Sequence, residues 1–201
     1  MKTKNLFRVW LTKLGLSETG IKRASKIKPG MFVYADGLIS KKLILDRQIK
    51  AVVGYVENNI AYAVCLHQTH LPWSSRHIKI KAMKNTTDGK KSTLKILKDA
   101  QKIRRKAEAA QWCYDYAQNG VQRGEAYLPS VVEWEKFYNN KAAVNISLEK
   151  LNAVELCGPY WSSTVHIYSV PWKFDMSEGH RFFYIMHNYD FCVRPIIAIK
   201  I

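Results

Sequence analysis

The chain has 201 residues, of which 47% are hydrophobic and 24% are charged. This length and composition are typical of one folded domain, and they exclude a disordered or collagen-like chain. A run of roughly 18 apolar, uncharged residues would be needed to cross a bilayer as a helix, and the sequence contains none, so we expect no membrane span.

The formal net charge of +16 is concentrated in the first half of the chain. Residues 1–110 hold 24 Lys and Arg against 7 Asp and Glu, whereas residues 111–201 hold 8 against 9. Such an asymmetry indicates a polyanion, a membrane surface or an acidic protein as partner, or else a solvated face that keeps the protein soluble. The residues we expect to contact an acidic partner or nucleic acid are Lys95, Lys98, Lys102 and Arg105.

Residues 1–27 form a basic N-terminal segment whose apolar residues have the spacing of a short amphipathic helix. The segment begins like a signal peptide, but Arg8 and Lys13 interrupt its apolar run and no small-residue cleavage site follows. We therefore expect no signal peptide. The expected location is the cytoplasm or a virion, with display on a surface by an unrecognised route left open.

Two β-hairpins are predicted within residues 31–66. The first turns at Asp36-Gly37, a dipeptide that favours a type I′ turn, in which both central residues have a positive φ. The second joins strands at 51–56 and 60–65 through residues 57–59. The polar residues that follow, 67–92, are expected to be irregular.

Three helices are predicted in the middle of the chain. The first begins with a cap at Ser92 or Thr93 and ends before Gly120. The second starts at Ser130, which forms a capping box with Glu133, and the third covers roughly 143–151. Apolar residues at steps of three and four predict the buried face of the first helix: Leu94, Leu97, Ala100, Ile103, Ala107, Ala110, Tyr114 and Ala117.

From Tyr160 onward the pattern returns to β-strands, at 172–176, 180–186 and 193–201. Pro195 indicates an edge or a bulge in the last strand, because proline lacks the N–H that a central strand needs. Strands, then helices, then strands again is the order of an α+β fold, with antiparallel hairpins and two or three helices.

Little in the sequence points to catalysis. No two of the four cysteines are close enough in sequence to form a zinc knuckle or a redox pair. They could form two disulfides in an oxidising compartment, but without an export signal we expect four reduced and mostly buried thiols. His67 and His70 are three residues apart, but no further ligand follows at metal-binding spacing. We therefore expect no enzymatic activity, no metal site and no cofactor.

Residues 164–191, which we call the aromatic segment, are rich in aromatic side chains separated by small polar ones. A strand with this sequence would carry large apolar groups on both faces. One interpretation is a strand buried on both faces. The alternative is an exposed binding surface, since rigid aromatics provide contact area at low entropic cost and polar neighbours adapt to a ligand.

Three motifs surround the aromatic segment: Leu-Pro-Ser at 128–130, Tyr-Trp-Ser-Ser at 160–163 and Val-Arg-Pro at 193–195. Together they resemble the C-terminal half of bacterial C-type lectin-like domains. Within that group the chain resembles the variable proteins of diversity-generating retroelements, relatives of the phage major tropism determinant. The resemblance implies a C-type lectin-like domain over residues 28–201, with a variable ligand-binding region at about 164–191.

In that family, adenine-directed mutagenesis rewrites chosen codons between the motifs, and the surrounding residues form an invariant framework. The resemblance implies framework roles for Trp172, Phe174, Asp175, Gly179 and Arg194. For Arg194 we expect a structural salt bridge in preference to ligand contact. The implied variable ligand-binding positions are Val165, His166, Ile167, Tyr168, Ser169, Val170, His180, Phe182, Phe183, Tyr184, Ile185, His187, Asn188, Tyr189, Asp190 and Phe191.

The resulting prediction is a non-enzymatic protein that recognises a protein or cell-surface ligand through a diversified surface; its oligomeric state is left open. Three alternatives remain. The basic half, residues 1–110, could bind nucleic acid or another polyanion. The chain could be an ordinary lectin-like adhesin domain without diversification. It could also be an enzyme related to sulfatase activators, which would need a redox-active cysteine.

Overall fold

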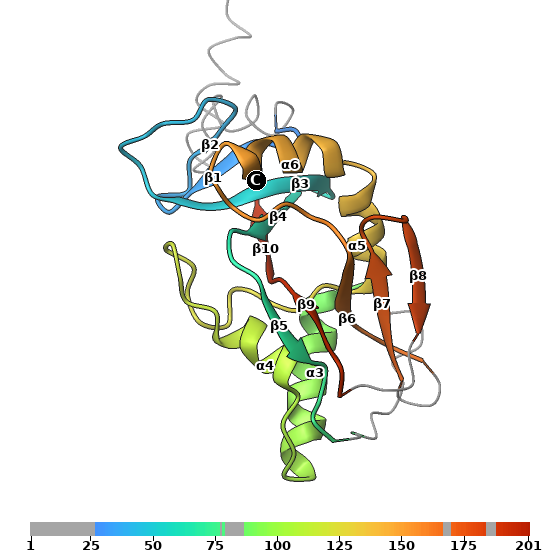
Figure 1. Cartoon of the computed structure of the whole chain (residues 1–201). Coiled ribbons are helices and arrows are strands. Elements are labelled where there is room, and N and C mark those ends of the chain that lie inside the picture. Colours follow the sequence, from blue (N-terminus) through green and yellow to red (C-terminus); the bar gives the residue numbers. More distant parts are fainter. Residues whose placement is uncertain (1–26, 77, 79–86, 167–169, 184–187) are drawn as a thin grey trace, which may run out of the picture.

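The computed structural model describes residues 27–76, 78, 87–166, 170–183 and 188–201. Within these residues the chain forms four helices and two five-stranded sheets, as Figure 1 shows. Strands come first, helices next and strands last, so the predicted α+β class is confirmed. The amphipathic helix predicted in the N-terminal segment lies outside the described residues.

The first sheet has the strand order β10-β4-β3-β1-β2. Its members are β1 (Phe32–Tyr34), β2 (Ile39–Ser40), β3 (Ile49–Glu57), β4 (Ile60–Cys65) and β10 (Ile196–Lys200). Both predicted hairpins are present, because β1 pairs with β2 and β3 pairs with β4 in antiparallel register.

The turns of the two hairpins differ from each other. In the first hairpin only Gly37 has a positive φ, of 86°, and its N–H donates to the Tyr34 carbonyl, so the predicted type I′ turn is wrong. In the second hairpin Asn58 and Asn59 both lie in the left-handed region, with φ of 50° and 58°. Two consecutive left-handed residues are the signature of a type I′ turn, and asparagine tolerates this conformation better than most residues do.

The single long helix predicted from residue 92 to 119 is instead two helices, α3 (Gly89–Lys102) and α4 (Glu108–Asp115). Arg104 adopts a left-handed φ of 52°, and the N–H groups of Arg104 and Arg105 donate to the carbonyls of Gln101 and Ala100. This hydrogen-bond pattern is a Schellman motif, which ends a helix and is usually built with glycine. Because this position holds arginine and not glycine, the sequence carries no signal for the end of the helix.

The beginning of α3 also differs from the prediction. Asp88 caps the helix, and its carboxylate accepts a hydrogen bond of 2.9 Å from the Lys91 N–H. Ser92 and Thr93 are buried inside the first turns instead of capping them. The Thr93 hydroxyl donates to the carbonyl of Leu128 and accepts from its N–H, both at 3.1 Å, and so ties α3 to the chain that leads into the next helix.

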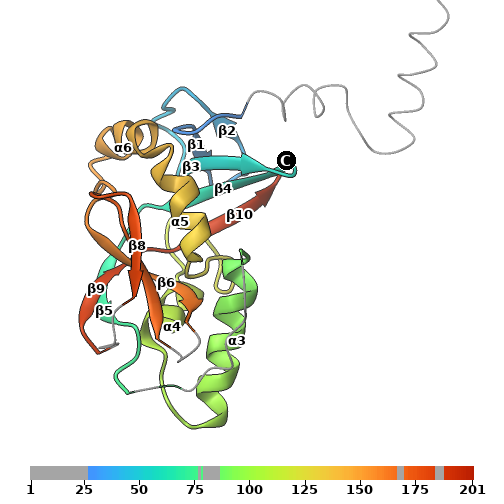
Figure 2. The same cartoon turned by 90° about the vertical axis from the view of Figure 1, so that its right-hand side faces the viewer.

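Two further helices follow, α5 (Val131–Tyr138) and α6 (Lys141–Glu149). The capping box predicted at the start of α5 is confirmed, since Ser130 and Glu133 hydrogen-bond each other's backbone N–H. Trp134 and Phe137 of α5 are fully buried in the main core. Both helices contact β3, and Figure 2 shows α6 at the end of the molecule opposite the far end of α3.

The second sheet has the order β5-β9-β6-β7-β8. Its strands are β5 (Thr69–Pro72), β6 (Pro159–Val165), β7 (Pro171–Asp175), β8 (His180–Phe183) and β9 (Asp190–Val193). Residues 67–92 are therefore not wholly irregular, because they supply β5. The predicted last strand, 193–201, is divided at Arg194 and Pro195, where the chain leaves the second sheet and enters the first as its edge strand β10.

None of the helices in the described part of the chain is long and apolar enough to cross a membrane.

Candidate functional site

The three sequence motifs meet one another in the structure and hold strand β6 in place. The Trp134 indole donates to the carbonyl of Trp161 at 3.0 Å, and the Trp161 indole donates to the carbonyl of Leu71 at 3.0 Å. The Ser163 N–H donates to the Pro129 carbonyl at 2.7 Å, which joins the second motif to the first. Buried, hydrogen-bonded tryptophans leave this strand little freedom, so it is a rigid base for the neighbouring positions.

Arg194 of the third motif is fully buried where the chain passes from one sheet to the other. Its guanidinium donates to the carbonyls of Cys65, Leu66 and Val154, at distances between 2.5 and 3.1 Å, and to Gln68 Oε1 at 3.2 Å. Its role is structural, as expected. The predicted salt bridge is not seen: within the described residues the partners of this side chain are neutral oxygens instead of a carboxylate.

Two more of the predicted framework residues lie in the turn between β7 and β8. The Asp175 carboxylate accepts hydrogen bonds from the N–H groups of Ser177 and Glu178, at 2.7 and 3.2 Å. Gly179 has a φ of 76°, and a Cβ there would overlap the Tyr138 ring, far inside van der Waals contact. Only glycine combines this backbone conformation with such a close approach. Asp175 and Gly179 therefore determine the turn.

Of the sixteen predicted ligand-binding residues, ten are described. Ile167, Tyr168, Ser169, Tyr184, Ile185 and His187 lie outside the described residues. Five of the ten are exposed, namely His180, Phe183, Asn188, Tyr189 and Asp190, and four are half-buried, namely His166, Val170, Phe182 and Phe191. Val165 is buried in the core cluster beneath α3, which corrects the expectation that its side chain is part of the outward surface.

Three aromatic rings form a cluster that we call the aromatic patch: His166, Trp172 and Phe183. The rings of His166 and Phe183 stack with centroids 5.2 Å apart and planes 16° apart, while Trp172 meets Phe183 edge-on at 5.3 Å. His166 directly follows β6, Trp172 is near the start of β7 and Phe183 ends β8, and these strand ends lie at one end of the sheet (Figure 1). Phe183 is 50% exposed, so the patch presents apolar surface to solvent.

A second aromatic cluster surrounds Lys173 on the opposite face of the same strands. In the β7–β8 ladder Trp172 pairs with Phe183 and Lys173 pairs with Phe182, so the two pairs point to opposite faces. The Lys173 ammonium lies 3.3 Å from the ring centroid of Phe191 and 4.6 Å from that of Phe182. Such contacts are cation–π interactions, and burial lowers the pKa of Lys173 from 10.5 to about 8.

Predicted variable residues therefore lie on both faces of β8, with His166 and Phe183 on one side and Phe182 and Phe191 with Lys173 on the other. A ligand that contacts residues of both faces has to bind at the end of the sheet and not on one of its faces. For β8 the interpretation of a strand buried on both faces is wrong, since Phe182 is half-buried and the other three residues of the strand are exposed. The end of a sheet suits substitution, because its side chains have few neighbours to displace.

The described residues offer one cysteine–histidine contact, between Cys192 Sγ and His70 Nε2 at 3.1 Å. Burial raises the pKa of Cys192 to about 11, so its sulfur is a protonated thiol at neutral pH, whereas a catalytic cysteine has a lowered pKa. Cys65 and Cys113 are also buried and free, whereas Cys157 is exposed, so the thiols are mostly buried, as predicted. In the described part of the chain no three His, Cys, Asp or Glu side chains form a metal-binding group.

The four basic residues predicted to contact an acidic partner have different surroundings. Lys95 and Lys102 both pair with Asp99, at 2.5 and 3.4 Å, on their own helix. Lys98 and Arg105 instead line a groove between α3 and α4. The four residues therefore do not form one surface: two pair with Asp99 and two line the groove.

Two important residues had no functional signal in the sequence. Gln68 accepts from the Tyr160 hydroxyl at 2.7 Å and from Arg194, and so connects the second and third motifs. Lys173 reads in the sequence as one lysine between two aromatic residues. Only the placement of Phe182 and Phe191 around it reveals a buried cation beneath the predicted variable positions.

Comparison with known proteins gives a likeness in fold alone. No protein-family model and no curated protein sequence matches the chain. Among solved structures, a fimbrial protein from Bacteroides ovatus ATCC 8483 superimposes with a TM-score of 0.69 at 13% sequence identity. The superposition covers 86% of this chain and 49% of that one, so the chain spans about half the length of its structural neighbour.

Proposed function

We propose that the chain is a non-enzymatic ligand-binding protein with a C-type lectin-like fold, in which the aromatic segment forms a diversified surface produced by a retroelement. The observation that carries the proposal is the contrast between framework and variable positions. Phe174 in β7 is buried, and so is Arg194 directly after β9, where its guanidinium is hydrogen-bonded. In contrast, His180 and Phe183 in β8 and Tyr189 directly before β9 are exposed.

This contrast fits diversification on energetic grounds. Substitution of an exposed residue usually changes the free energy of unfolding by about 0.5 kcal/mol or less, so many sequences can share one framework. Exposed aromatic rings serve as anchors for a protein ligand, because Tyr, Trp and Phe contribute most where they become desolvated. The likeness to a fimbrial protein is compatible with display on a cell or particle surface.

The first test is made on DNA. Sequencing the 3′ end of the gene from many clones of one population should reveal amino-acid changes restricted to the proposed variable positions, with Trp172, Phe174 and Arg194 unchanged. The flanking DNA should hold a reverse-transcriptase gene and an imperfect repeat that differs at adenines. Identical clones and no repeat would contradict diversification and leave an ordinary lectin-like domain.

The second test is made on the protein. A variant with His166, Phe183 and Tyr189 all changed to serine should keep a cooperative melting transition within about 5 °C of the wild type. In the matched control variant the buried residues Trp161, Phe174 and Arg194 are changed to serine in the same way, and this variant should not fold. If the first variant also unfolds, the aromatic segment is part of the core and the proposed binding surface does not exist.

A further inference from the structure

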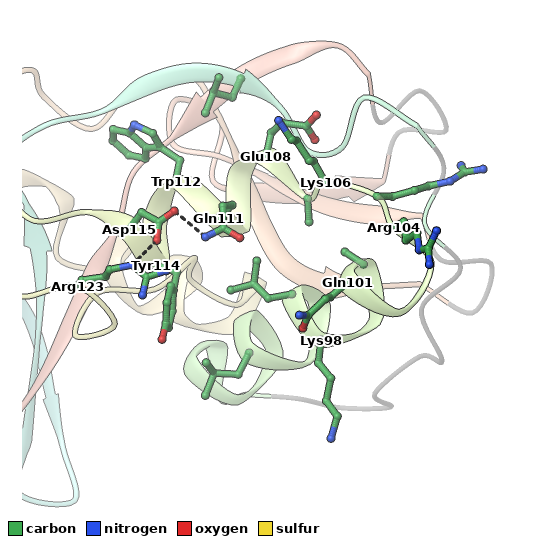
Figure 3. A pocket seen from close by; sticks show the side chains of 16 residues that line it. Lys98, Gln101, Arg104, Lys106, Glu108, Gln111, Trp112, Tyr114, Asp115 and Arg123 are labelled. Carbon is green, nitrogen blue, oxygen red and sulfur yellow. Dashed lines mark hydrogen bonds and ion pairs between the residues drawn. The ribbon is translucent and has the colours of Figure 1, made fainter.

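A groove between α3 and α4 lies apart from the aromatic patch and has a volume of about 1110 Å³. Figure 3 shows its lining side chains, which come from both helices, from the turn that joins them, from Leu71 of β5 and from Arg123. Leu94, Leu97 and Trp112 supply its apolar part. Leu94 is 46% exposed even though it sits in the middle of an amphipathic helix.

The apolar lining is the helix face that the sequence pattern predicts to be buried. Five residues of that predicted face line the groove: Leu94, Leu97, Ala100, Ala107 and Tyr114. The Schellman motif at Arg104 turns the chain back, so that α4 packs beside α3 without filling the space along the leucines. Ala100 and Ala107 are buried, whereas Leu97 is half-buried and Leu94 is 46% exposed. These two leucines are therefore open to apolar side chains of another molecule.

The charges around the groove identify the kind of molecule. Lys98, Arg104 and Lys106 are exposed along its rim, and the described residues contain no ion pair for any of them. The two carboxylates of the lining are already engaged. Glu108 accepts from the Ser75 N–H at 2.9 Å, and Asp115 pairs with Arg123 at 2.8 Å.

Basic side chains also surround a neighbouring hollow beyond the turn. A second hollow of about 350 Å³ shares Arg104, Arg105 and Lys106 with the groove and adds Arg76 and Ser75. The groove therefore combines an apolar floor along α3 with a cationic end at the 103–106 turn. An occupant that matches both needs apolar side chains and carboxylates on one short segment.

We propose that the α3–α4 groove binds an acidic amphipathic segment of another protein. Its apolar side chains contact Leu94, Leu97 and Trp112, and its carboxylates reach Lys98, Arg104 and Lys106. Nucleic acid fits less well, because it has no apolar side chains to contact Leu94, Leu97 and Trp112. The chain's own N-terminal 26 residues carry seven Lys and Arg against one Glu and so have the wrong charge to occupy the groove.

The test uses the full chain and three fluorescent probes. The first is an acidic peptide of roughly 18 residues with leucines at helical spacing and glutamates on the other positions. The second has the same composition in scrambled order, and the third is a single-stranded DNA of equal length. Fluorescence anisotropy at increasing salt should show saturable binding of the first probe and weaker binding of the other two.

Variants then locate the site. Leu94→Ser and the pair Lys98→Glu and Arg104→Glu should each weaken binding of the first peptide by about fivefold or more. Leu45→Ser and Lys41→Glu are matched controls, because Leu45 is 87% exposed and Lys41 is exposed far from the groove in sequence, and they should leave binding unchanged. All substituted side chains are exposed, and circular dichroism verifies that each variant folds.

Three outcomes would overturn the proposal. The first is no saturable binding of the amphipathic peptide. The second is equal binding of the scrambled peptide with no effect of Leu94→Ser, which would mean attraction by charge alone. The third is tighter binding of the DNA, with affinity that falls steeply with salt and does not depend on Leu94, which would mark the basic half as a nucleic-acid surface.

Discussion

The ammonium group of Lys173 lies 3.3 Å from the ring centroid of Phe191, closer than to either Phe182 or Trp161. Lys173 belongs to a framework strand, whereas Phe191 and Phe182 are proposed variable positions. A buried cation thus lies directly beneath side chains that diversification would replace. A version of the protein with small residues at these two positions would expose a positive charge within the proposed ligand surface.

The first prediction concerns this contact. Phe191→Ala should raise the pKa of Lys173 from about 8 toward 10.5, because water would reach the ammonium and remove part of the desolvation that lowers its pKa. An NMR titration of the lysine side-chain signals measures the shift. Phe183→Ala is the control, since Phe183 belongs to the opposite face of the ladder. An unchanged pKa in Phe191→Ala would show that the ring does not shield the ammonium.

The second prediction separates surface from core within one hairpin. Phe174→Ala should lower the free energy of unfolding by about 3–5 kcal/mol, because Phe174 is 1% exposed and its removal leaves a cavity. Phe183→Ala should cost about 1 kcal/mol or less, mainly from the lost stacking on His166. Urea denaturation measures both values. Similar losses for the two variants would mean that Phe183 is a core residue.

The third prediction tests the buried arginine. Arg194→Lys should destabilise the protein by roughly 3 kcal/mol, because a lysine cannot donate to oxygens from residues as far apart as Cys65 and Val154. Arg123→Lys, at an exposed arginine paired with Asp115, should cost less than about 1 kcal/mol. A small effect at position 194 in chemical denaturation would mean that the charge suffices and the hydrogen-bond geometry does not matter.

The fourth prediction compares two glycines that share a left-handed backbone. Gly158→Ala should cost about 1 kcal/mol, because φ is 70° and an added Cβ would have no atom within 4 Å. Gly179→Ala should cost clearly more, since its Cβ would overlap the Tyr138 ring. Thermal unfolding of the two variants isolates the steric contribution. Equal melting temperatures would show that Tyr138 moves aside.

The fifth prediction concerns pH. Burial raises the pKa of Glu133 from 4.5 to about 7, against the hydrogen bonds from Ser130 and Tyr127 that favour the ionised form. Between pH 4.5 and 7 the folded carboxyl therefore holds more protons than the unfolded one, so its contribution to stability falls as pH rises. Glu133→Gln should remove this part of the pH dependence. Parallel stability curves for wild type and variant across this window would contradict the raised pKa.

Local sequence determined the features that depend on adjacent residues. The capping box of Ser130 and Glu133 and the hairpin through Asn58 and Asn59 arise within a few residues, so the sequence alone predicted them. The α+β order followed from the succession of hydrophobic periods. The predicted length of the first helix was wrong, because Arg104 ends the helix in a left-handed conformation that usually requires glycine.

Tertiary structure alone decided the surroundings of the candidate site. Val165 and Phe183 are equally apolar in sequence, yet one is buried beneath α3 and the other is half exposed. The partners of Arg194 are carbonyl oxygens, which every residue possesses and no sequence pattern marks. Burial and hydrogen bonding at these positions depend on which distant elements pack together, and that depends on the summed free energy of the whole core instead of any local run of residues.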